Sequence, residues 1–255
     1  MSDEVTVTDD GDGTLVITID RPRARNAIDE ATARSIADGL DRLDADPALA
    51  AGIVTGAGGT FSSGMDLKAF VRGERPVVPG RGFAGIARRS ASKPVIAAVE
   101  GYALAGGFEI VLACDLVVAA RGATFGLPEV RRGLVAAGGG LLRLPRRIPY
   151  HVAMELAVLG SHVDAGRMYE LGLVNRLVDD GAALDTAREL ARAIAANGPL
   201  AVAATKRIVV ESADWPAEDA FERQAEIAGP VAASADAREG AIAFAEKRAP
   251  VWTGR

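Results

Sequence analysis

The chain has 255 residues, 49% of them hydrophobic, and a net charge of −5, so it can bury a sizeable core as one large domain or two small ones. Its single cysteine, Cys114, excludes an internal disulfide, and no His, Cys or carboxylate cluster has metal-ligand spacing. Scattered arginines and few aromatic residues give no footprint for nucleic acid, and the sequence shows neither a signal sequence nor an apolar run of ~20 residues, so we expect a cytoplasmic protein that is not in a membrane.

The first elements are predicted to be a β-hairpin, a helix and a strand. Residues 5–7 and 14–19 alternate apolar and polar side chains around Asp-Gly-Asp-Gly, which is typical of a hairpin. Ile36, Leu40 and Leu43 have helical spacing after Asp29, a suitable N-cap, and Asp46-Pro47 ends the helix. Residues 49–55 then form a continuous apolar run that indicates a buried strand.

A second cycle follows the same order. Residues 94–99 predict an apolar strand, 107–114 a short helix after a Gly-rich turn, and 115–119 another strand. Strands that alternate with helices to about residue 180 indicate an α/β core with largely parallel pairing. Residues 72–82 are rich in Gly and Pro and predict a surface loop.

The last part of the chain is predicted to be helical. After residues 175–178 the pattern gives helices at 183–196, 200–211, 216–228 and 235–247. Such a tail has no sheet of its own, so its apolar faces must be buried on the core or on another subunit. Periodicity leaves both possibilities open.

Several common motifs can be excluded. The Gly-rich segment 53–64 lacks the third glycine and the helix of a dinucleotide fingerprint, since Phe61 stands where that glycine is needed, and it lacks the Gly-Lys-Ser/Thr of a phosphate loop. Ser62 and Ser63 are not in a Gly-x-Ser-x-Gly frame. His151 and His162 lie in or beside a predicted helix, where a surface or core role is expected.

Five segments, taken together, resemble the crotonase superfamily, the enoyl-CoA hydratase/isomerase family. They follow one another in the family's order and extend over nearly the whole chain. They are Asp20-Arg-Pro-Arg-Ala-Arg-Asn-Ala27, Phe61-Ser-Ser-Gly-Met-Asp-Leu-Lys68, Glu100-Gly-Tyr-Ala-Leu-Ala-Gly-Gly-Phe-Glu109, Phe125-Gly-Leu-Pro-Glu-Val-Arg-Arg-Gly133 with Gly138-Gly-Gly140, and Phe244-Ala-Glu-Lys-Arg248.

The resemblance implies both a fold and a partner. The fold is a crotonase-like spiral of ββα units at residues 1–197, followed by a helical oligomerisation region at 198–255. The partner is an acyl-CoA substrate, with no organic cofactor or metal beyond the CoA that the substrate carries. The assembly is a homotrimer, or a hexamer made of two trimers.

The resemblance also assigns four catalytic positions. The backbone N–H groups of Met65 and Gly106 would bind the thioester oxygen, because an enolate needs two donors aimed at one atom. Glu109 and Glu129 match the acid/base pair, and the apolar neighbours of Glu109 would raise its pKa. Taken singly, each feature has a simpler reading: glycines that permit turns, a Glu109 that faces solvent or pairs with an arginine, and a Glu129 in an ordinary first helical turn.

Binding of the CoA portion is implied for nine residues. They are Arg23, Ala24, Arg25, Ser63, Asp66, Leu67, Lys68, Phe244 and Lys247, the last two reaching the CoA across a subunit interface. Lys68 and Lys247 equally suit solvated positions, and Phe244 equally suits core packing. Three positions depart from the family pattern: Met65 for Ala, Ala105 for Gly and Glu100 for Asn.

The expected activity is that of an enoyl-CoA hydratase, which adds water across the 2,3 double bond. Another lyase or isomerase of the superfamily, such as a carnitinyl-CoA dehydratase or an enoyl-CoA isomerase, is the nearest alternative, because one enolate-stabilising site supports several outcomes. A non-catalytic acyl-CoA-binding protein is the alternative from another class. Two glutamates argue against it, since binding alone does not need two acids.

Overall fold

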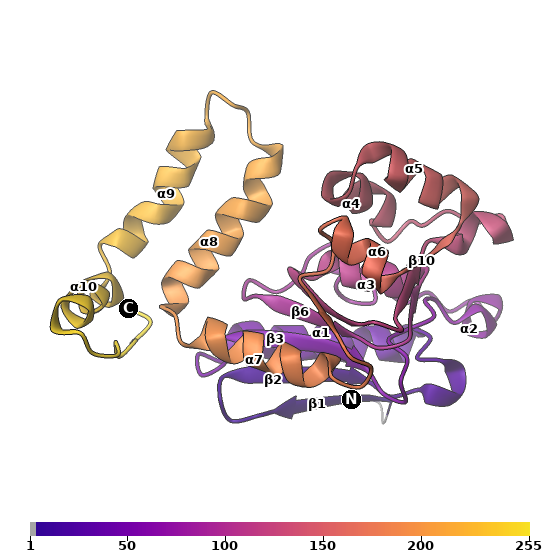
Figure 1. Ribbon diagram of the computed structural model, residues 1–255, viewed down its shortest axis with the longest axis horizontal. Helices are drawn as coiled ribbons and strands as arrows, with labels where there is room; N and C mark the ends of the chain where they lie inside the picture. Colours follow the sequence, from indigo (N-terminus) through magenta and orange to yellow (C-terminus); the bar gives the residue numbers. More distant parts are fainter. Residues whose placement is uncertain (1–3) are drawn as a thin grey trace.

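The computed structural model describes residues 4–255, with a six-stranded sheet at its centre (Figure 1). Residues 1–3 lie outside the described residues. The expected absence of a signal sequence concerns the N-terminus, which includes them. The strands, in sheet order, are β1 (Val5–Asp9), β2 (Thr14–Ile19), β3 (Ala51–Gly56), β6 (Val95–Val99), β8 (Leu116–Ala120) and β11 (Arg176–Val178). The β1–β2 pair is antiparallel, which confirms the hairpin, and the remaining neighbours are parallel.

A smaller second sheet is made of three short strands, which lie in the sequence after β6, after β8 and before β11. It consists of β7 (Tyr102–Leu104), β9 (Thr124–Gly126) and β10 (His162–Asp164), with β7 parallel to β9. Isolated parallel bridges, Ser62 with Ala103 and Ile28 with Met65, extend this stack to the earlier part of the chain. The repeated order of main strand, second-layer segment and helix is the expected stack of ββα units.

The helices of the α/β part follow the predicted order, with several additional short ones. Helix α1 begins after Asp29, whose carboxylate accepts a hydrogen bond from the Thr32 N–H at 2.8 Å, and it buries Ile36, Leu40 and Leu43 as expected. The bounds are α1 Glu30–Ala45, α2 Leu67–Val71, α3 Gly106–Ala113, α4 Gly140–Arg147, α5 Tyr150–Leu159, α6 Ala165–Glu170 and α7 Ala183–Ala195, with 3-10 turns η1 Pro22–Ala24 and η2 Pro128–Arg132.

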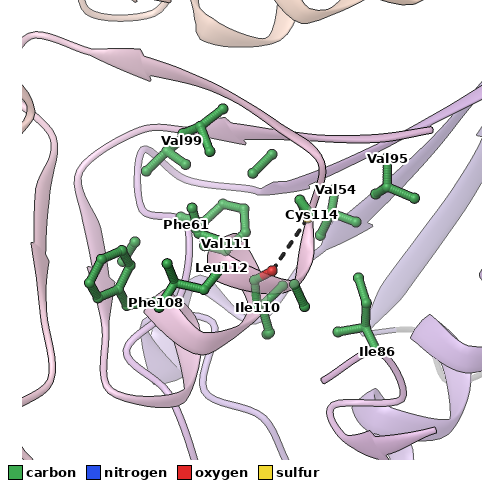
Figure 2. Close-up of a cluster of buried hydrophobic side chains, with 14 of the residues drawn as sticks. Val54, Phe61, Ile86, Val95, Val99, Phe108, Ile110, Val111, Leu112 and Cys114 are labelled. Carbon is green, nitrogen blue, oxygen red and sulfur yellow. Dashed lines mark hydrogen bonds between the residues drawn. The ribbon is translucent and has the colours of Figure 1, made fainter. Parts of the chain in front are cut away.

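Both faces of the main sheet are covered by apolar side chains. On one face α7 lies across the strands (Figure 1) and places Ala183, Ala187 and Ala191 against inward-facing strand residues. The other face packs on α1, α3 and the second sheet, and its cluster includes Phe61 and Phe108 (Figure 2). Cys114 belongs to this cluster and is fully buried, and burial raises the pKa of its thiol to about 12, so it is a core residue as expected.

The segment predicted as an exposed loop at residues 72–82 is more ordered than its composition suggests. It contains β4 (Val77–Val78), which pairs with β5 (Gly82–Phe83) in a small antiparallel ribbon. Arg81 is only 5% exposed and forms an ion pair with Asp41 of α1. The segment therefore lies at the surface as predicted, with most of its residues exposed, but it is not a simple loop, because the buried Arg81 side chain pairs with the exposed Asp41 and holds the segment onto the first helix.

The C-terminal helices extend away from the sheet (Figure 1). They are α8 (Pro199–Glu211), η3 (Ser212–Asp214), α9 (Ala220–Ala232) and α10 (Ala235–Glu246). The helix predicted at 216–228 begins four residues later because residues 216–219 form a turn, and it continues past Pro230. No residue of α8 or α9 is buried in the described chain. No single described helix is long and apolar enough to cross a membrane, although α7 and the bent segment after it, Ala183–Ala195 with Pro199–Asp214, pass that test as a pair.

Candidate active site

Two backbone turns meet at the carboxyl ends of β3 and β6. In the first turn, both backbone groups of Ser62 hydrogen-bond to β7. The Ser62 N–H donates to the Tyr102 carbonyl at 2.9 Å, and the Leu104 N–H donates to the Ser62 carbonyl at 3.0 Å. A Cβ on Gly64 would lie 2.8 Å from the Gly106 nitrogen, and a Cβ on Gly107 would lie 2.2 Å from the Ser62 carbonyl oxygen. Glycine is therefore required on both turns for the two backbones to approach this closely.

The predicted donors lie at this junction. Met65 follows Gly64, and Gly106 is the first residue of α3, where N–H groups have no partner within the helix. Among the described residues neither the Met65 nor the Gly106 N–H donates a hydrogen bond. Ala105 precedes the helix with φ +50° and ψ −126°, a conformation that costs a non-glycine residue about 1–3 kcal/mol. The strained residue re-aims the chain at the point where α3 starts.

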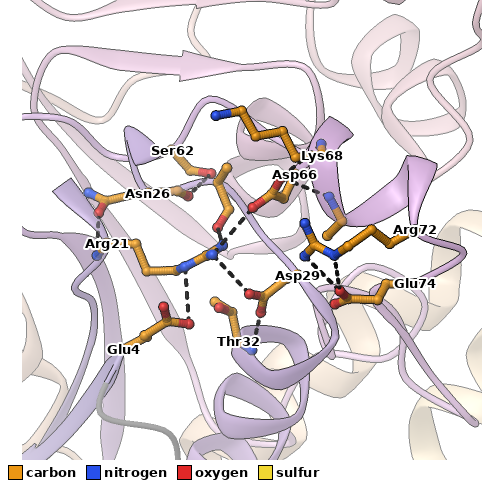
Figure 3. A network of polar contacts seen from close by, with 12 residues as sticks. Glu4, Arg21, Asn26, Asp29, Thr32, Ser62, Asp66, Lys68, Arg72 and Glu74 are labelled. Atoms are coloured by element: carbon orange, nitrogen blue, oxygen red, sulfur yellow. Dashed lines mark hydrogen bonds and ion pairs between the residues drawn. The ribbon is translucent and has the colours of Figure 1, made fainter. Parts of the chain in front are cut away.

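A polar network holds the first turn in place (Figure 3). The Arg21 guanidinium pairs with Asp29 at 2.9 Å and Asp66 at 3.3 Å, while Asn26 donates to the carbonyls of Ala57 and Thr60. The Asp66 carboxylate also caps α2. Burial alone would raise the pKa of Asp66. The hydrogen bond from the Ala69 N–H and the charge of Arg21 instead keep that pKa below its ordinary value. Arg21 and Asn26, both from the early Arg-Pro-x-x-x-Asn-Ala segment, thus help to position the turn.

Glu109 lies one turn into α3 and is 4% exposed. Its Oε1 accepts a hydrogen bond from the Gly140 N–H at 2.9 Å, and Gly138 supplies a second backbone donor. Burial, and then the charge of Glu129, raise the pKa of Glu109 to about 7. A Cβ on Gly138 would lie 2.5 Å from Oε2, so the glycine segment before α4 is shaped around this carboxylate.

Glu129 lies in η2, directly after Pro128. Its Oε2 is buried and has no hydrogen-bond partner among the described residues. Burial raises the pKa of its carboxyl, while its own backbone N–H and the Arg132 charge oppose that rise. A buried carboxylate oxygen without a partner is costly, so this atom is suited to bind a proton, a water or a substrate.

One cavity of about 1920 Å³ joins these groups. It is lined by all four predicted catalytic residues, Glu109, Glu129, Met65 and Gly106, and by seven of the nine predicted CoA contacts, Arg23, Ala24, Arg25, Ser63, Asp66, Leu67 and Lys68. Phe244 and Lys247 do not line it, and the Phe244 side chain is 88% exposed on α10. Their expected role belongs to a neighbouring subunit and stays a prediction.

The cavity also includes residues that sequence reasoning missed. Phe83 packs on the second turn so closely that a Cβ on Gly106 would lie 2.4 Å from its ring. Val209 and Val210 come from α8, and His162 from β10. These positions depend on how distant segments pack, and no local motif marks them. No cluster of metal-ligating side chains occurs within residues 4–255.

Comparison with known proteins agrees with this geometry. The sequence pattern described as enoyl-CoA hydratase/isomerase matches residues 9–255. This chain belongs to the enoyl-CoA hydratase/isomerase family. Relatives in that family include enoyl-CoA hydratase EchA19 of Mycobacterium tuberculosis, 44% identical and covering 95% of this chain and 94% of the relative, and carnitinyl-CoA dehydratase of Escherichia coli K12, 44% identical over both full lengths. The crystal structure of enoyl-CoA hydratase EchA1 from Mycobacterium marinum covers both chains fully, with 59% identity and a TM-score of 0.97.

The family membership confirms the crotonase fold, and the structure explains one departure from the family pattern. Glu100, which stands where Asn is usual, accepts hydrogen bonds from the Gly181 N–H at 3.0 Å and the Ala183 N–H at 3.1 Å. These donors lie at the start of α7, where backbone N–H groups need acceptors. Glu100 therefore caps the helix that covers the sheet and is not part of the cavity lining.

Proposed function

We propose that this protein is an enoyl-CoA hydratase. The observation that carries the proposal is the placement of two carboxyl groups with raised pKa, Glu109 and Glu129, in the cavity that also exposes the Met65 and Gly106 N–H groups. Two free donors suit an oxygen that gains charge, and two acids suit the transfer of two protons. The hydratase names of its relatives support the same reaction.

The geometry divides the reaction among these groups. The thioester oxygen accepts hydrogen bonds from Met65 and Gly106, which lowers the energy of the enolate that forms when water adds at C3. Glu109 holds the water and takes its proton, while the water oxygen forms the new bond to C3. Glu129 delivers a proton to the α carbon, and its partnerless Oε2 lies free for that exchange. The charge of Glu129 raises the pKa of Glu109, so the titrations of the two acids are coupled.

The CoA portion is assigned to the segments around η1 and α2. Arg23, Arg25 and Lys68 supply positive charge for the phosphates, Ala24 and Ser63 let the backbone approach, and Leu67 supplies apolar contact. Asp66 lines the same region, but its carboxylate is used by Arg21 and the α2 cap, so its part in binding is to fix the turn. No further cofactor is proposed.

The alternative within the family is a dehydratase or isomerase of related acyl-CoA thioesters. The full-length similarity to carnitinyl-CoA dehydratase supports it, since the same oxyanion site and acids serve the reverse elimination of water. A non-catalytic acyl-CoA-binding role would not need the two acids, Glu109 and Glu129, that line the cavity.

Mixing the purified protein with crotonyl-CoA and following the loss of enoyl absorbance tests the proposal. Hydration is expected at a rate that falls when either acid is changed. Absence of hydration, with carnitinyl-CoA dehydrated instead, would favour the alternative.

We also propose that the protein acts in the cytoplasm as a homotrimer or hexamer. The support is the exposed apolar surface of the C-terminal helices, including Val209, Phe221 and Phe244, which a symmetric ring would bury. Phe244 and Lys247 would then reach the CoA bound to a neighbouring subunit.

A further inference from the structure

The glycine segment that binds the Glu109 carboxylate is itself held by an arginine. Arg143 lies on α4, and its side chain reaches back over the start of its own helix, the direction that long helical side chains favour. A Cβ on Gly139 would collide with the Arg143 guanidinium, so only glycine fits beneath it. Gly139 stands between Gly138 and Gly140, whose N–H groups donate to the Glu109 carboxylate.

The same guanidinium joins this segment to a second one. Nη2 of Arg143 donates to the Ala87 carbonyl at 2.6 Å, and the side chain lines the cavity while it is half-buried. Within residues 4–255 the guanidinium makes this one hydrogen bond and no ion pair. A half-buried cation without an ion pair is costly unless an opposite charge lies near it.

Glu109 supplies that opposite charge. Burial, and then the charge of Arg147, lower the pKa of Arg143, whereas the charge of Glu109 opposes the fall. In turn, burial and the charge of Glu129 raise the pKa of Glu109, whereas the backbone donors and the charge of Arg143 oppose the rise. An arginine stays protonated over the working range of an enzyme, so its charge on this side of the carboxylate is constant.

The separation of the two groups matters as much as their charges. A carboxylate in direct contact with an arginine has a strongly lowered pKa and is a weak base. No ion pair joins Arg143 to Glu109 in the described chain, so the carboxylate keeps a raised pKa of about 7. The positive charge is near enough to favour the carboxylate form and too far away to remove its basicity.

Other cations on the cavity wall do not occupy an equivalent position. Arg88 and Arg132 are exposed, and the charge of Arg132 acts on Glu129. Arg146 also lies on α4 and lines the cavity, but it is exposed and pairs with Asp214 at 3.0 Å. Arg143 therefore differs from them in contacting the segment that binds Glu109.

We infer that Arg143 is a positioning residue for Glu109. Its guanidinium holds the glycine segment to which the carboxylate is hydrogen-bonded, and it places a constant positive charge on that side of the carboxylate without pairing with it. This inference rests on the proposed hydratase function, in which Glu109 takes a proton from water.

The pH dependence of hydration tests the inference. Because Glu109 must be deprotonated to act as a base, the acid limb of kcat/KM reports its pKa. In Arg143→Gln this limb should move to higher pH by about half a unit to one unit, less than the roughly 1–3 units that a directly paired arginine causes. The variant should thus lose about three- to tenfold more kcat/KM near pH 6 than near pH 9. An equal loss at both pH values overturns the inference.

Two further variants separate the charge of Arg143 from its packing. Arg143→Lys keeps the charge but not the planar fork, so its limb should lie closer to that of the unmodified protein than to that of Arg143→Gln. Arg146→Gln removes the same charge from the same helix, and its limb should stay in place. A limb displaced equally in Arg143→Lys, or in Arg146→Gln, overturns the inference. If circular dichroism shows Arg143→Gln to be unfolded, Arg143→Met carries the same measurement without a buried amide.

Failure of this inference can be told apart from failure of the hydratase function. In protein labelled with ¹³C at its glutamate carboxyl groups, the Glu109 signal is the one that Glu109→Gln removes, and its titration needs no substrate. If no enoyl-CoA is hydrated, the hydratase function fails. A titration midpoint that rises in Arg143→Gln then still supports the inference, and an unchanged midpoint rejects it.

Discussion

Glu109 and Glu129 differ in how their carboxylates are held. The Glu109 carboxylate accepts backbone hydrogen bonds from the glycine segment before α4, whereas Oε2 of Glu129 has no partner in the described chain. Burial raises the pKa of both groups. One acid is therefore fixed in position and the other is open to ligand, which suits a reaction that needs one group to orient water and another to exchange a carbon-bound proton.

Replacing either acid by glutamine should remove most hydration. Gln keeps the size of the side chain but cannot accept a proton, and a positioned acid or base contributes about 100- to 10,000-fold. Steady-state kinetics on crotonyl-CoA with Glu109→Gln and Glu129→Gln measures the loss. Calorimetric binding of a saturated acyl-CoA is the control and should change little. Near-normal turnover in one variant would remove that residue from the mechanism.

The raised pKa of Glu109 gives two pH effects. As a base it must be deprotonated, so kcat/KM should rise as pH increases through about 7. The folded state holds its proton up to about 7, whereas the unfolded state releases it near the ordinary value, 4.5. The stability that this carboxyl contributes is thus complete below the lower value and is lost as pH rises through the higher one.

Glu109→Gln should therefore gain stability relative to the unmodified protein as pH rises from about 5 to about 8. The gain is about 2–3 kcal/mol at most, since one pKa unit corresponds to about 1.4 kcal/mol. Urea unfolding of both proteins at the two pH values gives the difference. A difference that does not change with pH would show that the carboxyl is not desolvated.

At the scale of elements, the start of α3 carries one donor of the proposed oxyanion site. Gly106→Pro removes the N–H, which should cost about 100- to 1,000-fold in turnover, and proline is tolerated at a first helical position. Gly106→Ala is the matched control, because its Cβ meets the same Phe83 ring but its N–H remains. Met65→Ala should be mild, since the backbone donates. If the Pro and Ala variants are both folded by circular dichroism and equally active, the proposed donor is wrong.

The cap on α7 can be tested apart from catalysis. Glu100→Ala leaves the Gly181 and Ala183 N–H groups without their acceptor and should destabilise the protein by about 1–2 kcal/mol. Glu100→Gln keeps a side-chain oxygen and should recover most of that stability. Thermal unfolding compares the two, and kcat should be unaffected in both. Equal loss of stability in both variants would show that the charge of Glu100, not its acceptor oxygen, is what matters.

The sequence predicted elements where the periodic pattern is long. Helix α1 and strands β2, β3 and β6 have enough residues to reveal their period, and the Asp29 cap marks the helix start. The second sheet was missed because its strands have three residues each, too few to show alternation. The four residues proposed as catalytic could be placed in the cavity because they lie in local segments that resemble those of the family, whereas Phe83, Arg88 and Val209 reach the cavity only through tertiary packing.

At the scale of the whole molecule, the last residues of the chain hold the C-terminal helices in place. Asp236 of α10 is tied to the last residues, with the Thr253 N–H at 2.7 Å, and the Trp252 indole donates to the Ala196 carbonyl at 2.9 Å. The end of the chain thus returns to the α7–α8 corner and fixes α10. Helix α7 packs on the sheet, whereas α8 extends away from it. The division of the chain between residues 197 and 198 stays a prediction.

An apolar surface held in a fixed arrangement but left uncovered should associate with another copy. The Phe221 side chain is 81% exposed on α9, and Phe244 on α10 is 88% exposed. A charge at a buried interface position is strongly unfavourable, so Phe221→Glu should dissociate the trimer into monomers. Sedimentation at micromolar concentration should show a trimer or hexamer for the unmodified protein, and for the control Val158→Glu on α5, which is 58% exposed. If Phe244 and Lys247 complete a neighbour's CoA site, the monomer should also show a raised KM for crotonyl-CoA. A monomeric protein before any substitution would refute the ring.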